Sequence, residues 1–231
     1  DPSAEDHATT TAHLRDLAKT LFREGKVTTI VGWVPGPMPG QMIPGFVTSE
    51  AEAGRLVWSD RCHTNLATYL AGPNKVTDKI TDEATGKVAI FLKQCDARSV
   101  RALLQEAQVP RDEVVLIGVS CAGVTEEGRL SRKCYACDGD VADVCDYAVS
   151  AAGVQTGAVV ANANRSTAQD PRDAEIAYLE SLPPKDRWGF WQEQFADCIR
   201  CYACRAVCPM CYCGSCITEQ HRPQWIPTSI N

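Results

Sequence analysis

The sequence lacks the glycine-rich segments Gly-x-Gly-x-x-Gly and Gly-x-x-x-x-Gly-Lys-Ser/Thr, which hold dinucleotides and nucleotide phosphates. It has few histidines, and they are scattered: His7, His13, His63 and His221. No nucleophile stands beside a base that would activate it. These absences argue against a self-contained catalytic site, and we assign no catalytic residue.

Positive charge and long apolar runs are also scarce. The net charge is −6 and the pI is near 5.3, which argues against a nucleic-acid partner. No stretch approaches the roughly 18–20 apolar residues that span a bilayer. No basic-then-apolar leader is visible, but the chain begins Asp1-Pro2 without a methionine, so a removed upstream segment stays open.

What the sequence has in excess is cysteine. It contains 13 cysteines, an odd number, and most of them are separated by gaps of two or three residues. A chain of 231 residues that is 45% hydrophobic can form its own core and does not need a disulfide framework. The short gaps favour metal binding over disulfides, the alternative. Metal-bound cysteines imply a reducing compartment, and we expect a cytoplasmic location.

The N-terminal part predicts helices around a first strand. Leucine and phenylalanine recur at helical spacing over residues 10–25, and an apolar strand follows over residues 27–34. Residues 35–44 are rich in proline and glycine and predict an irregular loop. Ser49 and Glu52 form a capping-box pattern, which predicts a helix to about Trp58, and a short helix is expected over residues 63–70.

The middle of the chain predicts a β-α-β unit. Two apolar strands, residues 87–92 and 113–119, flank a helix over residues 97–107, so the strands should be parallel. We expect an α/β fold with a small, mostly parallel sheet and flanking helices.

The segments that follow are less regular. Residues 123–150 look loop-rich, residues 154–160 predict a strand, and residues 170–182 predict a helix. A last, aromatic-rich helix with Trp188 and Phe195 leads into Cys198, either under a metal site or in the core. We place an α/β domain at residues 1–183 and a ferredoxin-like iron–sulfur module at residues 184–231.

The C-terminal cysteines carry the most specific signal. Cys198, Cys201, Cys204 and Cys208 are separated by two, two and three residues, and Pro209 follows. This is the bacterial ferredoxin spacing, in which three cysteines bind one 4Fe-4S cluster and the fourth binds another. The alternative is a zinc knuckle built from overlapping Cys-x-x-Cys pairs.

The run departs from a plain ferredoxin because no second set of this kind follows. It continues with three closely spaced cysteines: Cys211, Cys213 and Cys216. The first three cysteines of the run need a fourth ligand, for which Cys216 and Cys213 are candidates. Cys208 and Cys211 either complete a neighbouring cluster or stay unligated, so two or three clusters per chain are expected.

A second group of cysteines follows the two predicted parallel strands. Cys95 and Cys121 each lie just past one of them, so both should reach the carboxyl edge of the sheet, where open α/β sheets bind ligands. Cys134 and Cys137 form a Cys-x-x-Cys pair in the next loop. These cysteines make a candidate second cluster site. The alternative is that Cys95 and Cys121 are ordinary buried thiols.

Three neighbouring residues carry weaker signals. Arg98 lies next to the Cys95 segment and is a candidate for tuning a cluster or binding an anion, or it is an ordinary surface arginine. Cys145 is a weaker ligand candidate, and Cys62 is expected in the core.

Taken together, these segments resemble a known family. The resemblance rests on Leu56–Leu70, on Cys95-Asp-Ala-Arg98 followed by Gly118-Val-Ser-Cys121-Ala-Gly123, and on Cys134-x-x-Cys137. They are similar to the beta subunits of deazaflavin-linked (coenzyme F-420) hydrogenases and formate dehydrogenases. The match is closest to the bacterial formate-dehydrogenase-beta-like type with a C-terminal Cys-Ile-Arg-Cys-Tyr-Ala-Cys module.

This resemblance implies a subunit of a multi-subunit redox complex. Such a subunit relays electrons through 4Fe-4S clusters between a flavin or ferredoxin donor and a heterodisulfide-reductase-like, hydrogenase-like or formate-dehydrogenase-like partner. The resemblance also implies cluster ligation by two groups: Cys95, Cys121, Cys134 and Cys137, and Cys198, Cys201 and Cys204.

One departure from the resemblance keeps other functions open. The deazaflavin-reducing members carry their ferredoxin-like cysteines N-terminally and bind FAD, whereas here the cysteines are C-terminal and no flavin motif is seen. We therefore expect a non-catalytic electron-transfer subunit. The alternatives are a flavin-containing oxidoreductase subunit that reduces a deazaflavin or a similar small cofactor, and a zinc-stabilised scaffold.

Overall fold

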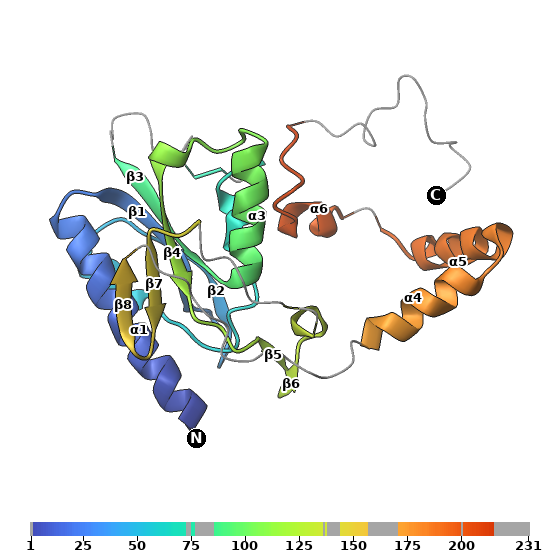
Figure 1. Ribbon diagram of the computed structural model, residues 1–231, viewed down its shortest axis with the longest axis horizontal. Coiled ribbons are helices and arrows are strands. Elements are labelled where there is room, and N and C mark those ends of the chain that lie inside the picture. Colours follow the sequence, from blue (N-terminus) through green and yellow to red (C-terminus); the bar gives the residue numbers. More distant parts are fainter. Residues whose placement is uncertain are drawn as a thin grey trace.

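The fold is α/β and is organised around a six-stranded sheet (Figure 1). The computed structural model describes residues 2–72, 75–76, 86–135, 137, 144–156, 171–199 and 201–214. In the sheet the strand order is β2-β1-β3-β4-β7-β8. The strands are β1 (Val27–Pro35), β2 (Met42–Val47), β3 (Lys87–Leu92), β4 (Val114–Val119), β7 (Tyr147–Ser150) and β8 (Gly153–Thr156).

The four central strands are parallel. β1 pairs with β3, β3 with β4, and β4 with β7, and Ile90 is opposite Leu116 across the β3–β4 pair. Nearly every residue of β1, β3 and β4 is buried, as expected for parallel strands covered on both faces. The predicted β-α-β unit is confirmed, so both strands deliver their next residues to one carboxyl edge.

Two long helices lie on opposite sides of this sheet (Figure 1). Helix α1 (Pro2–Arg23) packs against β7 and β8, which are far from it in the sequence, and its Leu14 and Ala18 are fully buried. It begins several residues before the predicted start. Helix α3 (Gln94–Gln105) packs near β3 and β4 with Val100 and Leu103 buried. It starts and ends earlier than predicted, and Ala107 lies beyond its end with a positive φ of 53°.

The predicted loop over residues 35–44 is wrong at its end, because β2 begins at Met42. β2 pairs antiparallel with β1 and places Pro44 opposite Trp33. Proline lacks an amide proton, so it is tolerated in an edge strand that has a neighbour on only one side. β2 is such an edge strand, which explains how a proline-rich segment still joins the sheet.

Two predicted α-helices are short 3₁₀-helices instead: η1 (Glu50–Arg55) and η2 (Leu66–Tyr69). At η1 the Ser49 side chain makes no capping bond, and Glu52 instead accepts hydrogen bonds from the amide and hydroxyl of Thr48. At η2 the Asn65 side chain accepts from the amide of Ala67 at 3.0 Å. Asn65 therefore marks the true start of that helix.

The region predicted to be loop-rich contains a small two-stranded ribbon as well as β7. The ribbon consists of β5 (Thr125–Glu126) and β6 (Arg129–Leu130), and a 3₁₀-helix, η5 (Arg132–Cys134), follows it. The predicted strand over residues 154–160 is present as β8 up to Thr156, and its remainder lies outside the described residues. A short 3₁₀-helix, η4 (Arg111–Glu113), precedes β4.

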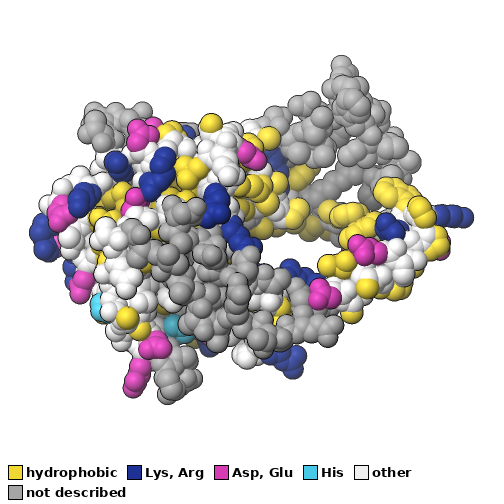
Figure 2. Space-filling view, viewed as in Figure 1, with side chains coloured by type: hydrophobic (Ala, Val, Ile, Leu, Met, Phe, Trp, Pro, Cys, Tyr) yellow, Lys and Arg dark blue, Asp and Glu magenta, His cyan; other side chains and the backbone are white. Residues whose placement is uncertain are grey.

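Two of the last three described helices project from the sheet domain, and the third packs against it (Figure 1). They are α4 (Pro171–Ser181), α5 (Pro184–Ala196) and α6 (Ala203–Val207). We call α4 and α5 the helical arm. No residue of α5 is buried, and Trp188 and Phe195 are 60% and 65% exposed. Core packing of the aromatic helix is therefore wrong for this chain, and Figure 2 shows hydrophobic side chains gathered on the arm.

Within the described ranges, none of the helices combines the length and the apolar character that crossing a bilayer requires.

Candidate functional site

The parallel strands bring two cysteines to the carboxyl edge of the sheet. Cys95 lies in the first turn of α3, directly after β3, and Cys121 follows β4. Cys121 is 8% exposed, and the two thiols are near enough to perturb each other electrostatically. The strand register thus produces the neighbourhood that the sequence predicts for this pair.

Two further cysteines interact with Cys121. Cys62, which is fully buried in the segment before η2, and Cys134, at the end of η5, both interact electrostatically with Cys121. We call Cys62, Cys95, Cys121 and Cys134 the edge thiols. The prediction that Cys62 is a core residue is confirmed, but the sequence did not predict that Cys62 lies near Cys121.

Burial favours the protonated form of three edge thiols, Cys62, Cys95 and Cys121, in the metal-free chain. Loss of hydration raises the pKa of Cys62 and Cys121 to about 11. Burial, and next the Asp96 carboxylate, raise the pKa of Cys95 to about 12. A metal that binds here must displace protons, so its affinity would increase with pH.

Backbone amides point at three of the sulfur atoms. The amide of Ser59 donates to Cys62 Sγ at 3.4 Å, and that of Val124 donates to Cys134 Sγ at 3.4 Å. The Gly123 backbone similarly hydrogen-bonds Cys121 and lowers the pKa that burial raises. Amide donors to sulfur stabilise thiolates and are among the features that tune iron–sulfur clusters.

Gly123 is required for this arrangement. Its φ is +112°, a conformation that L side chains rarely adopt, and a Cβ atom there would lie 2.5 Å from Leu130 Cδ1. Cys134 Sγ is only 3.9 Å from that same Cβ position. The glycine therefore lets the chain turn tightly between Cys121 and the ribbon that carries Cys134.

A buried ion pair lies beside the edge thiols. Lys93 and Asp96 are 1% and 0% exposed, and their Nζ and Oδ2 atoms are 2.9 Å apart. Lys93 lowers the pKa of each of Cys62, Cys95 and Cys121 against the effect of burial. The sequence analysis missed Lys93, because a lysine at a strand end is usually exposed.

The C-terminal cysteine run packs against the sheet domain through a short segment before β3. Thr68 Oγ1 donates to the carbonyl of Ala206 at 3.2 Å, and Tyr212 donates to Glu106 at 2.5 Å. Gly72 approaches the Tyr212 backbone closely. These contacts fix α6 beside η2 and α3.

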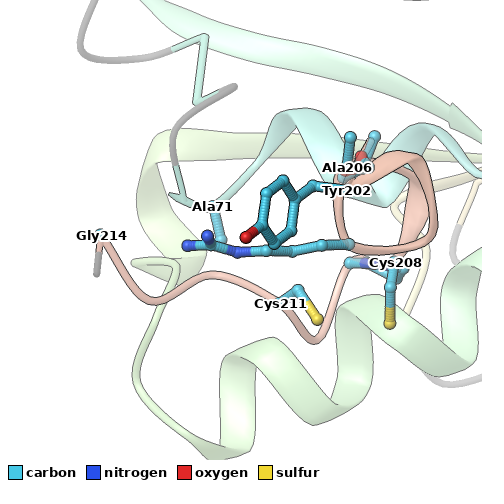
Figure 3. A pocket seen from close by; sticks show the side chains of 9 residues that line it. Ala71, Tyr202, Ala206, Cys208, Cys211 and Gly214 are labelled. Carbon is cyan, nitrogen blue, oxygen red and sulfur yellow. The ribbon is translucent and has the colours of Figure 1, made fainter. Parts of the chain in front are cut away.

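A cavity of about 270 Å³ lies between the run and η2 (Figure 3). Cys208, Cys211, Tyr202 and Arg205 line it from the run, and Thr68 and Ala71 line it from the sheet domain. Figure 3 shows the Cys208 and Cys211 side chains on the same side of the run. The cysteines left over by the ferredoxin spacing therefore share one cavity.

The other predicted ligands are more open to solvent or lie elsewhere. Cys198, Cys201, Cys204 and Cys213 are exposed, Cys137 is half-buried, and Arg98 is exposed on α3. Cys145 is half-buried and packs against the core, where it lines a small pocket together with Lys93 and Gly118. Cys216 lies outside the described residues.

Cysteine sulfur is the donor that the two groups of candidate ligands share. Among the described residues, no group of three or more His, Cys, Asp or Glu is arranged to hold one metal ion. Cysteines that bind a cube hold different iron atoms, so their sulfurs stand further apart than those around a single zinc ion. Both the edge thiols and the run supply cysteine sulfur, the usual cluster ligand.

A polar cleft adjoins the edge thiols. Its volume is about 1060 Å³, and its lining includes Arg61, His63, Glu126 and Arg129. His63 Nδ1 lies 3.6 Å from Glu126 Oε1. Since His63 follows Cys62 directly, the cleft and the edge thiols share one loop.

No protein-family model matches the sequence. The chain is 22% identical over 285 residues to the F420-dependent formate dehydrogenase 1 subunit beta of Methanococcus maripaludis, an alignment that covers 87% of this chain and 72% of the relative. It is 22% identical over 260 residues to the F420-dependent formate dehydrogenase subunit beta of Methanocaldococcus jannaschii, covering 77% of this chain and 66% of that relative. The similarity therefore extends over most of this chain.

Proposed function

We propose that this chain is an electron-transfer subunit of a multi-subunit redox complex and relays electrons through 4Fe-4S clusters. The names of its relatives support an oxidoreductase subunit, since both are beta subunits of formate dehydrogenases. The donor and partner that we propose are those of the resemblance: a flavin or ferredoxin on one side and a heterodisulfide-reductase-like or formate-dehydrogenase-like subunit on the other.

One observation carries the relay. The same short segment of chain contacts both groups of cysteines: Cys62 is an edge thiol, and Thr68 and Ala71 line the cavity that Cys208 and Cys211 share. Only a few residues separate these contacts in the sequence. Clusters held by the two groups would therefore be neighbours across a single layer of protein, which is the arrangement that rapid electron transfer requires.

The two groups of cysteines would give a bound cluster different surroundings. Iron–sulfur clusters supply one-electron transfer at potentials set by charge, hydrogen bonds to sulfur and solvent exposure. Cys62 and Cys121 are buried, whereas Cys198, Cys201 and Cys204 are exposed. The run would place its cluster near the surface, where a partner subunit exchanges electrons with it.

The helical arm supports assembly into a complex. Trp188, Trp191 and Phe195 form one stripe of α5 at helical spacing, and all three are exposed. Exposed apolar patches rimmed by polar residues are typical of protein interfaces. The arm leads directly into Cys198, so a subunit bound to the arm would lie beside the exposed cysteines.

Iron and acid-labile sulfide counts test the proposal most directly. The anaerobically purified chain should contain both, show a broad violet-to-blue absorption that dithionite bleaches, and give EPR signals when reduced. Cys198→Ser should remove the signals of one cluster, whereas the matched control Cys145→Ser should keep them all. A colourless, zinc-containing chain, or a Cys198→Ser variant with every signal intact, contradicts the proposal.

The polar cleft favours a second candidate function, that of a flavin-containing subunit that reduces a deazaflavin. The cleft is at the upper end of the size range of small-molecule sites, roughly 300–1,000 Å³, and several arginines line it. It also adjoins the edge thiols. Flavin peaks in the supernatant after acid precipitation would favour this function. Their absence from a chain that contains its iron–sulfur clusters would leave electron relay as the proposed function.

A further inference from the structure

Lys93 is the most unusual residue of the sheet core. It lies between the last residue of β3 and the first turn of α3, and its side chain is 1% exposed. Lysine is almost never fully buried unless it is paired, because removal of an ammonium group from water costs a large free energy. The surroundings of Lys93 must therefore compensate its charge.

Three contacts hold the Lys93 ammonium in place. Its Nζ lies 2.9 Å from Asp96 Oδ2 and donates to the carbonyl of Thr64 at 2.8 Å. It also lies 4.3 Å from the ring centroid of Trp33, whose face attracts cations. Asp96 Oδ2 accepts from the amide of Lys93 at 3.1 Å, so the carboxylate is fixed as well.

Stability alone explains this pair poorly. A buried ion pair often contributes no more than apolar residues of the same volume, because the loss of hydration offsets the attraction. Position offers a better explanation, since the pair lies at the carboxyl edge among the edge thiols. The pair is also asymmetric. Lys93 affects Cys121 more strongly than Asp96 does, and at Cys62 Lys93 acts while Asp96 is not among the main influences. At Cys95 the order is reversed, because the Cys95 thiol lies 3.5 Å from Asp96 Oδ1.

We propose that Lys93 is a positioning residue that supplies fixed positive charge to a thiolate site at the carboxyl edge, offsetting the charge of thiolates that bind an iron–sulfur cluster there. This inference rests on the proposed function, and it adds a residue that no cysteine spacing reveals. Reduction of the cluster adds one electron and forms no bond to Lys93. A nearby cation favours that electron and so raises the reduction potential.

Two variants of the whole chain give opposite predictions. In the double variant Lys93→Met/Asp96→Asn, both charges disappear without leaving a buried, unpaired ion. Because Lys93 outweighs Asp96 at Cys62 and Cys121, whereas Asp96 outweighs Lys93 at Cys95, the midpoint potential of the edge cluster should fall in an EPR-monitored titration. In Asp96→Asn the ammonium remains alone, and the same potential should rise.

Lys133 provides the matched control. It is an exposed cation that hydrogen-bonds the carbonyl of His63 at 2.7 Å and acts on Cys95. Because water and salt screen exposed charges, Lys133→Met should shift the potential less than the double variant does. Two outcomes at wild-type iron content would overturn the inference: unchanged potentials, or shifts of the same sign in Asp96→Asn and in the double variant. A purely structural role of the pair predicts no opposite shifts.

A cluster-free measurement separates failure of this inference from failure of the proposed function. If the wild type holds no iron and sulfide after reconstitution, the cluster proposal fails, but Lys93 still acts on the free thiols. Iodoacetamide labelling, read by mass spectrometry, should then modify Cys121 more slowly in the double variant, by roughly tenfold for each unit by which its pKa increases. The exposed Cys198 is the internal reference, and an unchanged ratio of the two rates would overturn the inference.

Discussion

Among the described cysteines, the buried and the exposed ones should differ in chemistry. Cys62 and Cys121 are buried at the sheet edge, while Cys198, Cys201 and Cys204 are exposed. Thiolates, not thiols, bind metal and react with reagents. The exposed cysteines of the run are therefore open to cluster assembly or to damage, and Cys62 and Cys121 are protected until a metal displaces their protons.

The raised pKa values predict a pH-dependent stability of the metal-free, reduced chain. Burial raises the pKa of Cys62 from an ordinary value near 9 to about 11. The folded chain thus keeps a proton that the unfolded chain has released. This stability is complete below about pH 9 and is lost as pH rises through 11, by about 1.4 kcal/mol for each pKa unit.

Urea unfolding at pH 8 and pH 10 checks this prediction. The free energy of unfolding should fall between the two values, and Cys62→Ala should make the fall smaller. The exposed Cys198→Ala is the control and should leave the pH dependence unchanged. An equal fall in Cys62→Ala and the parent chain would show that the Cys62 thiol does not carry this dependence.

Among the described elements, α5 is notable for a stripe of exposed aromatic side chains. Its apolar stripe includes Trp188 and Phe195, and the Trp191 and Phe195 rings stack with centroids 6.2 Å apart. Replacing Trp188 and Phe195 by serine should change the free energy of unfolding by no more than about 0.5 kcal/mol for each exposed position. If the arm binds a partner subunit, the same change should weaken that complex.

The measurement pairs urea unfolding with co-purification of the chain and its partner redox subunit, both produced from their own genes. Gln192→Ser is the matched control, because Gln192 is exposed on the same helix. Normal recovery of the complex with both aromatic residues replaced would remove the arm as an interface. A large loss of stability would instead mean that the arm is covered within the chain.

The elements that could be predicted from the sequence are those in which local pattern and tertiary packing agree. Parallel strands buried on both faces appear as continuous apolar runs, so β3 and β4 were predictable. β2 was not, because its proline and glycine content indicates a loop, and only pairing with β1 makes it a strand. The aromatic residues of α5 suggested burial because a single sequence does not show which apolar stripe is covered.

At the scale of the whole molecule, the close approach of Gly72 to Tyr212 is one of the contacts that join the cysteine run to the sheet domain. Gly72 has a φ of +70°, and a Cβ atom there would lie 2.8 Å from Tyr212 Cα. Because that neighbour is backbone, it has no flexible end that can move aside. Gly72→Ala should therefore displace the run and break the hydrogen bond between Tyr212 and Glu106.

Limited proteolysis checks this prediction, because a displaced run should be cleaved faster between α5 and Tyr212. Gly128→Ala is a closely matched control: Gly128 has a φ of +76°, but nothing lies within 4 Å of its Cβ position. Gly128→Ala therefore has the same kind of backbone strain, but its new methyl group meets no other atom. Equal cleavage of the two variants would mean that the Gly72 contact does not hold the run.

The candidate site was predictable only in part, for a physical reason. Cysteine spacing along the chain reports which sulfurs share a loop, so the run and the Cys134–Cys137 pair were visible. The predicted parallel strands also indicated that Cys95 and Cys121 lie close together. Lys93 and Cys62 join the site only through the packing of β3 against the loop before η2, and that contact leaves no periodic trace in the sequence.

Four of the five tryptophans form two optical reporters in one molecule. Trp33 and Trp58 are buried with ring centroids 5.2 Å apart, and Trp33 faces the Lys93 ammonium, whereas Trp188 and Trp191 emit from the solvated arm. Emission of the buried pair should be blue-shifted and that of the arm red-shifted. Wavelength-resolved fluorescence quenching can therefore follow events at the sheet edge and at the arm separately, in the same cuvette and without an added dye.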